Sequence, residues 1–168
     1  MANILLRYVV PAIAFLCGVV PVAALEPPVL KPSDFVDPQT VVMNTPHSFD
    51  ALRSRLEAAV KANGFFVVTR ASASAGAASR GLTIPGNLVV GVYRNDYAVR
   101  MLKASVAAGI EAPLRFYVTG NGDGTATLSY RPPTRTFAPY GASALTAMAG
   151  ELDAVWAKIA ADAAAPGK

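Results

Sequence analysis

The sequence predicts an α+β fold, with a single mixed or antiparallel sheet of about five strands and helices packed on one face. Three patterns support this prediction. Apolar residues recur at helical spacing in several segments, short β-branched runs lie between them, and two alternating runs flank a glycine-rich turn at residues 120–124. The expected order of elements is β-α-β-(α)-β-α-β-β-α, in which the element in parentheses is an optional short helix.

Residues 1–24 have the layout of a secretory signal peptide. One basic side chain, Arg7, precedes an almost wholly apolar run from Tyr8 to Ala24, and small residues lie just before a cleavage point after Ala24. We therefore expect cleavage there and a periplasmic or secreted mature chain without a transmembrane span. The alternative is an uncleaved N-terminal membrane anchor, although Pro11 and Pro21 disfavour a stable spanning helix.

The cysteine and charge content exclude several kinds of site in that mature chain. Cys17 is the only cysteine of the 168 residues, and it lies inside the apolar leader. After cleavage we expect no disulfide, no thiol nucleophile and no cysteine-ligated metal. The 15 basic and 11 acidic side chains are scattered rather than gathered in a basic stripe, so we predict no nucleic-acid partner.

The mature chain should open with an arm and then a strand. Residues 25–39 are rich in proline and lack apolar periodicity, which is typical of a linker or of an arm lying over the surface. Residues 40–45 predict the first strand, which ends before Pro46. One domain is then expected over residues 40–164, followed by a frayed tail at 165–168.

An amphipathic helix is predicted between Ser48 and Asn63-Gly64. Ser48 is a good N-cap, and Asn63-Gly64 supplies a left-handed stop. Between these ends apolar side chains recur at helical spacing, at Phe49, Leu52, Leu56 and Val60. His47, the only histidine, thus lies just before a capped helix, and we interpret it as an adjunct to that cap.

The middle of the chain predicts two further strands and a helix. Residues 65–69 form the second strand, and the small-residue stretch 71–80 is either a short helix or a mobile loop. Residues 88–93 are continuously apolar, which indicates a strand buried on both faces at the centre of the sheet. A helix capped by Asn95 or Asp96 should follow and end near Gly109, with a core face of Ala98, Met101, Leu102 and Ser105–Val106.

A β-hairpin with one apolar and one polar face is predicted for residues 113–130. Both strands alternate between apolar and polar side chains on either side of the turn. This alternation is typical of an antiparallel pair that helices cover on one side only, and with Thr119 opposite Thr125 the polar side chains of both strands share the uncovered face. The polar side chains on that face are Arg115, Tyr117, Thr127 and Ser129.

The last part of the chain should be an irregular connection followed by a long helix. Pro132, Pro133 and Pro139 disfavour regular structure in the connection. Residues 142–164 then show apolar side chains at helical spacing, with Trp156 on the core face.

These elements resemble, in order and spacing, the domain of unknown function 302 family of small, mostly prokaryotic α+β proteins. The matching stretches are Thr45–Asp50, Gly64-Phe65, Asn95, Ala112–Arg115, Gly124, Ser129-Tyr130 with Pro133, and Tyr140-Gly141. They span residues 41–161. The family usually has Asn-Pro where Asn95-Asp96 stands here, so the resemblance gives that turn no role. It implies this fold and a homodimer, and it implies no reaction.

The favoured function is a non-catalytic, exported binding or accessory module without metal or cofactor. An arginine fork suits carboxylate or phosphate groups, and tyrosine offers a flat amphipathic surface, so we expect a small anionic or amphipathic ligand. The polar hairpin face could equally be solvated or buried between two subunits. The candidate ligand-binding residues are Arg115, Tyr117, Tyr130, Asn95 and His47.

Two other functions stay open. The first is a metal-independent hydrolase or isomerase that uses acid–base catalysis, although no nucleophile elbow, zinc-protease motif or Walker loop occurs. The second is a structural or interaction partner of another envelope protein, reached by the proline-rich arm. The groups available for acid–base catalysis are His47, Asp50, Asp96, Glu111, Asp123, Tyr117 and Tyr130.

Overall fold

The structure is a computed structural model, and it describes residues 28–166. The predicted leader, with Cys17 and the cleavage point, lies outside the described residues, as do residues 167–168 of the predicted frayed tail.

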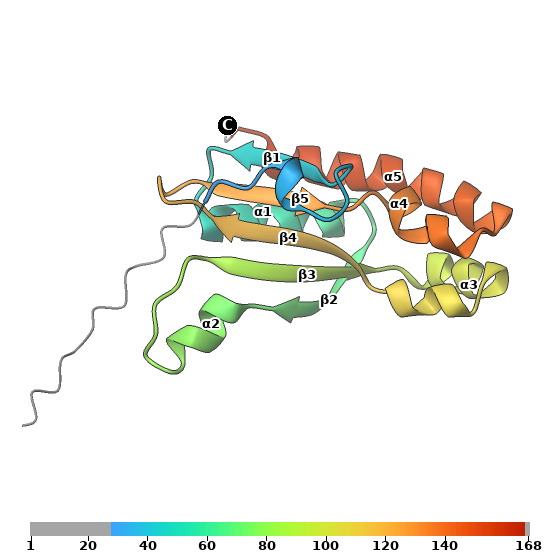
Figure 1. Cartoon of the computed structure of the whole chain (residues 1–168), viewed down its shortest axis with the longest axis horizontal. Coiled ribbons are helices and arrows are strands. Elements are labelled where there is room, and N and C mark those ends of the chain that lie inside the picture. Colours follow the sequence, from blue (N-terminus) through green and yellow to red (C-terminus); the bar gives the residue numbers. More distant parts are fainter. Residues whose placement is uncertain (1–27, 167–168) are drawn as a thin grey trace, which may run out of the picture.

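A single antiparallel sheet of five strands forms the centre of the fold (Figure 1). Its strands, in spatial order, are β1 (Val41–Thr45), β5 (Ala126–Tyr130), β4 (Leu114–Gly120), β3 (Asn87–Tyr93) and β2 (Phe66–Ala71). The predicted α+β class and single sheet are confirmed, and the sheet is antiparallel throughout. The apolar run at 88–93 is an inner strand, but the central strand is β4.

Two long helices pack together against one face of the sheet. They are α1 (Phe49–Ala62), which lies behind the sheet in Figure 1, and α5 (Ser143–Ala164). The shorter helices α3 (Asn95–Ala104) and α4 (Pro133–Phe137) pack against α5, and α2 (Ala73–Ala78) lies beside β3. Single 3-10 turns complete the fold, at η1 (Pro32–Asp34), η2 (Ala107–Glu111) and η3 (Ala138–Tyr140).

The predicted boundaries of α1 are confirmed by its caps. The Ser48 side chain accepts a hydrogen bond from the backbone N–H of Ala51, and Gly64 adopts a positive φ of 77° just after the helix. The optional helix in the stretch 71–80 is present as α2.

Two local predictions were wrong. The third helix ends at Ala104 rather than near Gly109, and its N-cap is Arg94 rather than Asn95 or Asp96. The connection after the hairpin is helical in α4, because Pro133 occupies the first helical turn, where a missing N–H costs no hydrogen bond.

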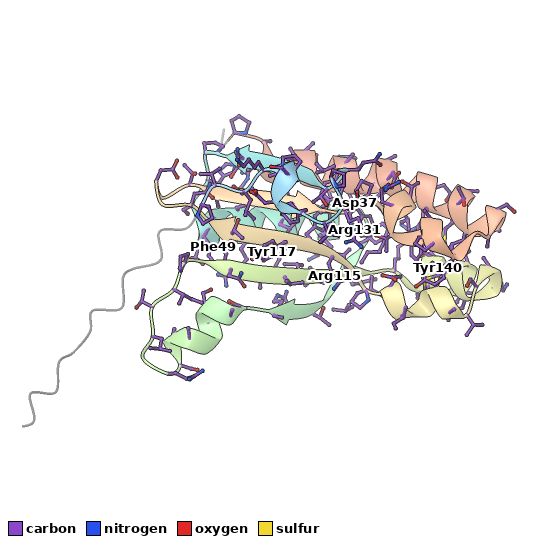
Figure 2. The ribbon with its side chains drawn as sticks, in the orientation of Figure 1. Asp37, Phe49, Arg115, Tyr117, Arg131 and Tyr140 are labelled. Carbon is purple, nitrogen blue, oxygen red and sulfur yellow. The ribbon has the colours of Figure 1, made fainter. Side chains whose placement is uncertain are left out.

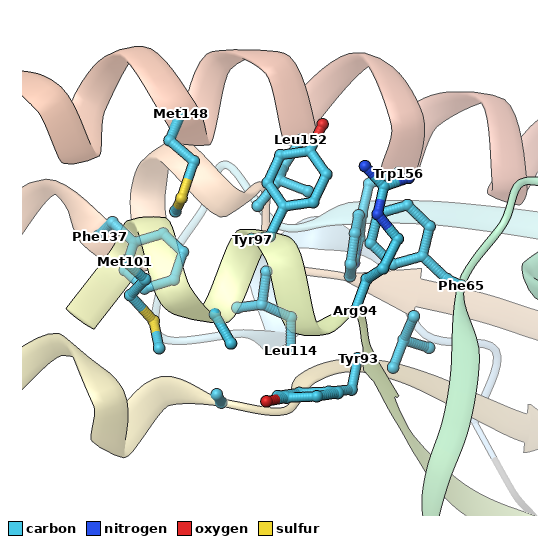
Figure 3. Close-up of a pocket in the computed structure, with 13 residues that line it drawn as sticks. Phe65, Tyr93, Arg94, Tyr97, Met101, Leu114, Phe137, Met148, Leu152 and Trp156 are labelled. Atoms are coloured by element: carbon cyan, nitrogen blue, oxygen red, sulfur yellow. The ribbon is translucent and has the colours of Figure 1, made fainter. Parts of the chain in front are cut away.

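Aromatic side chains pack between the helices and the face of the sheet that α1 and α5 cover. The Trp156 ring stacks on Phe116, with 5.6 Å between centroids and 10° between planes, and meets Phe65 edge-on at 5.4 Å. The Arg94 guanidinium lies 4.6 Å from the Phe65 centroid and 4.4 Å from that of Tyr97 (Figure 3). The void between these side chains is only about 40 Å³, far below the volume of small-molecule sites.

The other face of the sheet is crossed by residues 28–40, which we call the arm (Figure 1). The turn η1 lies within the arm, in front of β5 in this view. Ser129, which faces this side of the sheet and lines the same groove as Phe35 and Thr40 of the arm, is only 1% exposed. The face predicted to be free of helices is therefore partly covered by the chain's own N-terminal segment.

Candidate ligand-binding groove

Between the arm and the sheet lies a groove with a volume of about 530 Å³. This volume falls within the range of about 300–1,000 Å³ that is common for small-molecule sites. Its floor comes from the three adjacent strands β3, β4 and β5, and Phe35 and Thr40 of the arm contribute to its rim. The residues that line it are Phe35, Thr40, Asn87, Val89, Glu111, Leu114, Arg115, Phe116, Tyr117, Ser129, Tyr130, Arg131 and Thr136.

The register of the sheet brings the polar side chains of this groove together. Tyr117 pairs with Ser129 of β5 on one side and with Val89 of β3 on the other, and Gly91 of β3 is opposite Arg115. Paired residues point to the same side of a sheet. The predicted pairing of Thr119 with Thr125 was wrong by two residues, since Thr119 pairs with Thr127. A shift of two keeps every side chain on its face, so the predicted polar face was correct.

Arg115 supplies an unengaged positive charge to the groove. Its side chain is exposed, and no hydrogen bond or ion pair joins it to another of residues 28–166. Of the acidic groups near the groove, Glu111 accepts a hydrogen bond from the Tyr140 hydroxyl at 2.8 Å, and Asp37 pairs with other arginines. Figure 2 shows Arg115 and Tyr117 on neighbouring positions of the arm-covered face.

The hydroxyl of Ser129 is buried at the floor of the groove without a partner. Ser129 is 1% exposed, and its Oγ makes no hydrogen bond within the described part of the chain. The neighbouring Thr127 is different, because its Oγ1 donates to Asn44 Oδ1 at 2.9 Å. A buried hydroxyl without a partner costs about 1–3 kcal/mol and calls for an explanation.

The two tyrosines of the groove have different environments. Tyr117 is half-buried, and its hydroxyl accepts a hydrogen bond from the side-chain amide of Asn87. Tyr130 belongs mainly to the covered face, where its ring meets Phe116 edge-on at 5.2 Å. Burial raises the pKa of the Tyr130 hydroxyl, and the nearby Asp153 carboxylate raises it further.

A cluster of charged groups lies beside the groove, where the arm meets β5 and α4 (Figure 2). Asp37 Oδ2 is 3.3 Å from Arg135 Nε and 3.9 Å from Arg131 Nε. The pKa of the Asp37 carboxyl is lowered, first by the backbone N–H of Gln39, which donates to Oδ1 at 2.9 Å, and then by Arg135. The cluster therefore holds Asp37 as a carboxylate.

Three of the five predicted ligand-binding residues line the groove, namely Arg115, Tyr117 and Tyr130. The other two do not. His47 lies at the end of α5, where its Nε2 donates to the carbonyl oxygen of Ala165 at 2.8 Å. Asn95 begins α3 and accepts a weak hydrogen bond from the Tyr93 hydroxyl at 3.3 Å.

Sequence reasoning missed Phe35, Asp37 and Arg131 at this site. A signal for Arg131 was present, because the alternation of Thr127 and Ser129 continues to it with the same period of two. No such pattern exists in the arm, so nothing in the sequence pointed to Phe35 or Asp37.

Of the groups available for acid–base catalysis, Glu111, Tyr117 and Tyr130 line the groove, whereas His47, Asp50, Asp96 and Asp123 do not. Asp96 pairs with Arg94 at 2.7 Å and Asp123 accepts from the Thr125 hydroxyl at 2.6 Å, and these contacts lower the pKa of each carboxyl. Catalytic acids that work near neutral pH usually have a raised pKa. Among the residues that the structure describes, no three His, Cys, Asp or Glu side chains are grouped so that they could hold a metal ion.

Comparison with known proteins agrees with this architecture. The family model described as "Domain of unknown function DUF302" matches residues 41–163. The crystal structure of an uncharacterized conserved DUF302 protein from Bacillus stearothermophilus is similar, with a TM-score of 0.67 at 20% sequence identity. The similarity covers 74% of this chain and 98% of that one. No curated protein matches the sequence. None of the helices within residues 28–166 is both long and apolar enough to cross a membrane.

Proposed function

Because the chain belongs to the DUF302 family, whose description names no activity, we propose its function from the groove itself. We propose a non-catalytic binding module that takes a small amphipathic ligand by its anionic head. The observation that carries this proposal is the pairing of two unused donors on one wall, the Arg115 guanidinium and the buried Ser129 hydroxyl.

Both donors suit the same chemical partner. A guanidinium offers N–H groups in a planar fork that matches carboxylate or phosphate oxygens, and a serine hydroxyl adds one more donor. A bound anion would give Ser129 Oγ the hydrogen bond that it lacks within the described residues. Hydrogen bonds to a charged group contribute about 1.5–3 kcal/mol each, more than neutral ones.

The rest of the groove suits an apolar tail. Phe35 forms part of the rim, and Val89, which pairs with Tyr117 and so points to the same face, contributes apolar atoms to the floor. Sites for small molecules usually combine such apolar walls with a few placed polar groups that fix orientation. A carboxylate or phosphate with an alkyl chain of moderate length has this combination of groups.

Calorimetric titration would test the proposal with protein expressed from the full-length sequence. Decanoate and decyl phosphate supply the two candidate heads, and decanol supplies the same chain without charge. We expect at least one of the anions to bind and decanol not to bind. Arg115→Ala should weaken anion binding about tenfold or more, given the contribution of a charged hydrogen bond.

The matched control is Arg80→Ala, which removes an equal charge from an exposed position outside the groove lining. Arg80→Ala should bind as the wild type does. Equal binding by wild-type and Arg115→Ala proteins would remove Arg115 from the site, and no binding of either anion by the wild type would remove the proposed function.

We also propose that the protein is exported and acts as a homodimer. The leader-like composition of residues 1–24 supports export. Exposed apolar side chains at α3 and η2 support an interface, because Val106 and Ile110 are 79% and 82% exposed and Leu102 is 44% exposed. Mass spectrometry of the purified protein would test cleavage after Ala24. Light scattering of wild-type and Ile110→Asp proteins would test the dimer, which the variant should weaken.

A further inference from the structure

We infer that Asp37 is an internal competitor for the groove, so that the arm and an anionic ligand exclude one another at its arginine-rich end. The inference rests on the proposed function and adds a regulatory element to it. The arm would be a strap whose Asp37 carboxylate occupies Arg131 when the groove is empty and yields it when an anion arrives.

The first observation is the position of the Asp37 carboxylate. Its oxygen Oδ2 lies 3.3 Å from Arg135 Nε and 3.9 Å from Arg131 Nε, and its side chain is 13% exposed. Arg131 also lines the groove, together with Arg115. The carboxylate therefore occupies one end of a cationic surface, of which Arg115 is left without a partner among residues 28–166. A carboxylate on a ligand has the same chemistry and would bind the same donors.

The second observation is that Asp37 alone ties the arm to the rest of the protein by polar contacts. Within residues 28–166, every side-chain hydrogen bond or ion pair between residues 28–39 and the remainder of the chain has the Asp37 carboxylate at one end. The other hydrogen bonds of the arm are local, such as Lys31 N–H to Asp34 Oδ2 at 2.9 Å. Loss of the Asp37 carboxylate would thus remove these side-chain contacts between the arm and the rest of the described chain.

The third observation links that attachment to the shape of the groove. Phe35, two residues before Asp37, and Thr40, three residues after it, both contribute to the lining. The backbone N–H of Thr40 donates to the carbonyl of Asp37 at 3.0 Å, so the position of Thr40 depends on that of Asp37. Displacement of the carboxylate would therefore shift two lining residues and widen the groove at its Arg131 end.

Competition of this kind has a defined thermodynamic consequence. If Arg131 is free for a ligand only in the fraction of molecules whose arm is released, the apparent affinity for a ligand that uses Arg131 falls by that fraction. By linkage, a ligand that binds the released form must also release the arm. Removing the charge of Asp37 should therefore strengthen ligand binding rather than weaken it.

The experiment compares wild-type, Asp37→Asn and Asp34→Asn proteins, with decanoate as the probe. Asp34 is the matched control, because its carboxylate bonds only to the arm's own Lys31 N–H in the described structure. We expect Asp37→Asn to bind decanoate about fivefold more tightly, as the loss of a pair of exposed ion contacts allows. Asp34→Asn should bind as the wild type does.

Hydrogen exchange of the backbone amides of residues 31–40 provides the second measurement. Exchange should be faster in Asp37→Asn than in the wild type without any ligand, and it should become faster in the wild type when decanoate is added. The exchange of β4 amides should stay unchanged in both cases, which would show that the domain remains folded.

The outcomes separate the two proposals. Equal or weaker decanoate binding by Asp37→Asn, or slower exchange of the arm on addition of decanoate, would overturn the competition and leave the binding module intact, with the arm as a clamp. Absence of binding in both wild-type and Asp37→Asn proteins would overturn the proposed function, and the competition with it.

Discussion

The two faces of the sheet carry different tasks although they are made by the same strands. On the face under α1 and α5, Phe116, Val118 and Leu128 are 0% exposed and pack with the helices. On the face under the arm, the residues between them are Arg115, Tyr117 and Ser129, with donors that the described structure does not use. The period-two alternation of β4 and β5 thus separates stability from binding within two strands.

The coverings differ in the same way. The helices pack on the sheet through a wide apolar contact, whereas within residues 28–166 the arm has side-chain polar contacts to the rest of the domain only through Asp37. Segments with few buried contacts open locally at a small fraction of the free energy of global unfolding. The arm can therefore move when a ligand binds, whereas α1 and α5 cannot move without unfolding the domain.

The largest expected effect is a loss of stability on replacing a buried side chain of the helix-covered face. Trp156→Ala should lower the free energy of unfolding by about 3–5 kcal/mol, because it removes a side chain that is 1% exposed and stacked on Phe116. Urea unfolding followed by circular dichroism would measure it. Tyr117→Ala, on the arm-covered face, should cost clearly less. Equal losses for the two variants would contradict the division between the faces.

Two glycine substitutions test how tightly the arm-covered face is packed near β2. A methyl group on Gly91 would collide with Thr69 Oγ1 and lie 2.7 Å from Pro113 Cγ, so Gly91→Ala should cost about 1–3 kcal/mol. Gly76→Ala in α2 meets open space and should be neutral or stabilising by up to about 1 kcal/mol. Thermal unfolding of both variants would measure these changes. A Gly91→Ala protein as stable as the wild type would show that the arm-side surface near β2 is loosely packed.

Two neighbouring hydroxyls on β5 allow a finer test. Thr127→Val removes the hydrogen bonds to Asn44 and Asn121 and should cost about 1–2 kcal/mol, whereas Ser129→Ala removes a buried hydroxyl without a described partner and should leave stability unchanged or raise it by up to about 1–3 kcal/mol. Urea unfolding would measure both. Ser129→Ala should nonetheless weaken decanoate binding about tenfold, the effect of losing one hydrogen bond to a charged group. A large stability loss in Ser129→Ala would mean that its hydroxyl is already satisfied in the free protein.

Most of the fold could be predicted because it depends on local periodicity. Alternation in residues 114–130 predicted which side chains share a face, and that prediction survived a register error of two residues. Periodicity did not reveal what covers an apolar stripe. Leu102 and Val106 were assigned to the core, but they are 44% and 79% exposed, because α3 ends at Ala104 and turns this stripe away from the sheet.

The part of the site that sequence could not predict depends on contacts between distant segments. Asp37 and Arg135 are 98 residues apart, and the arm that carries Asp37 has no periodic pattern from which a contact could be inferred. The prediction of an irregular connection at Pro132 and Pro133 was wrong for a related reason. Proline disfavours a helix interior but fits a first turn, and only the tertiary structure shows which position it takes.

The smallest expected effect concerns the attachment of the arm and its dependence on pH. The pKa of the Asp37 carboxyl is lowered in the folded protein, chiefly by the Gln39 N–H and then by Arg135, from an ordinary value of about 3.9. A lowered folded pKa means that the stabilisation is complete above the unfolded value and is lost as the pH falls through the folded value. The arm should therefore detach below about pH 3.9.

The amide signals of Gln39 and Thr40 in NMR spectra should report this detachment with a midpoint below that pH. Asp37→Asn should show no such transition in the arm. A midpoint at or above the ordinary value would mean that the arginines do not bind the Asp37 carboxylate in solution. The arm would then lack this attachment, and the face of the sheet beneath it would be open to solvent.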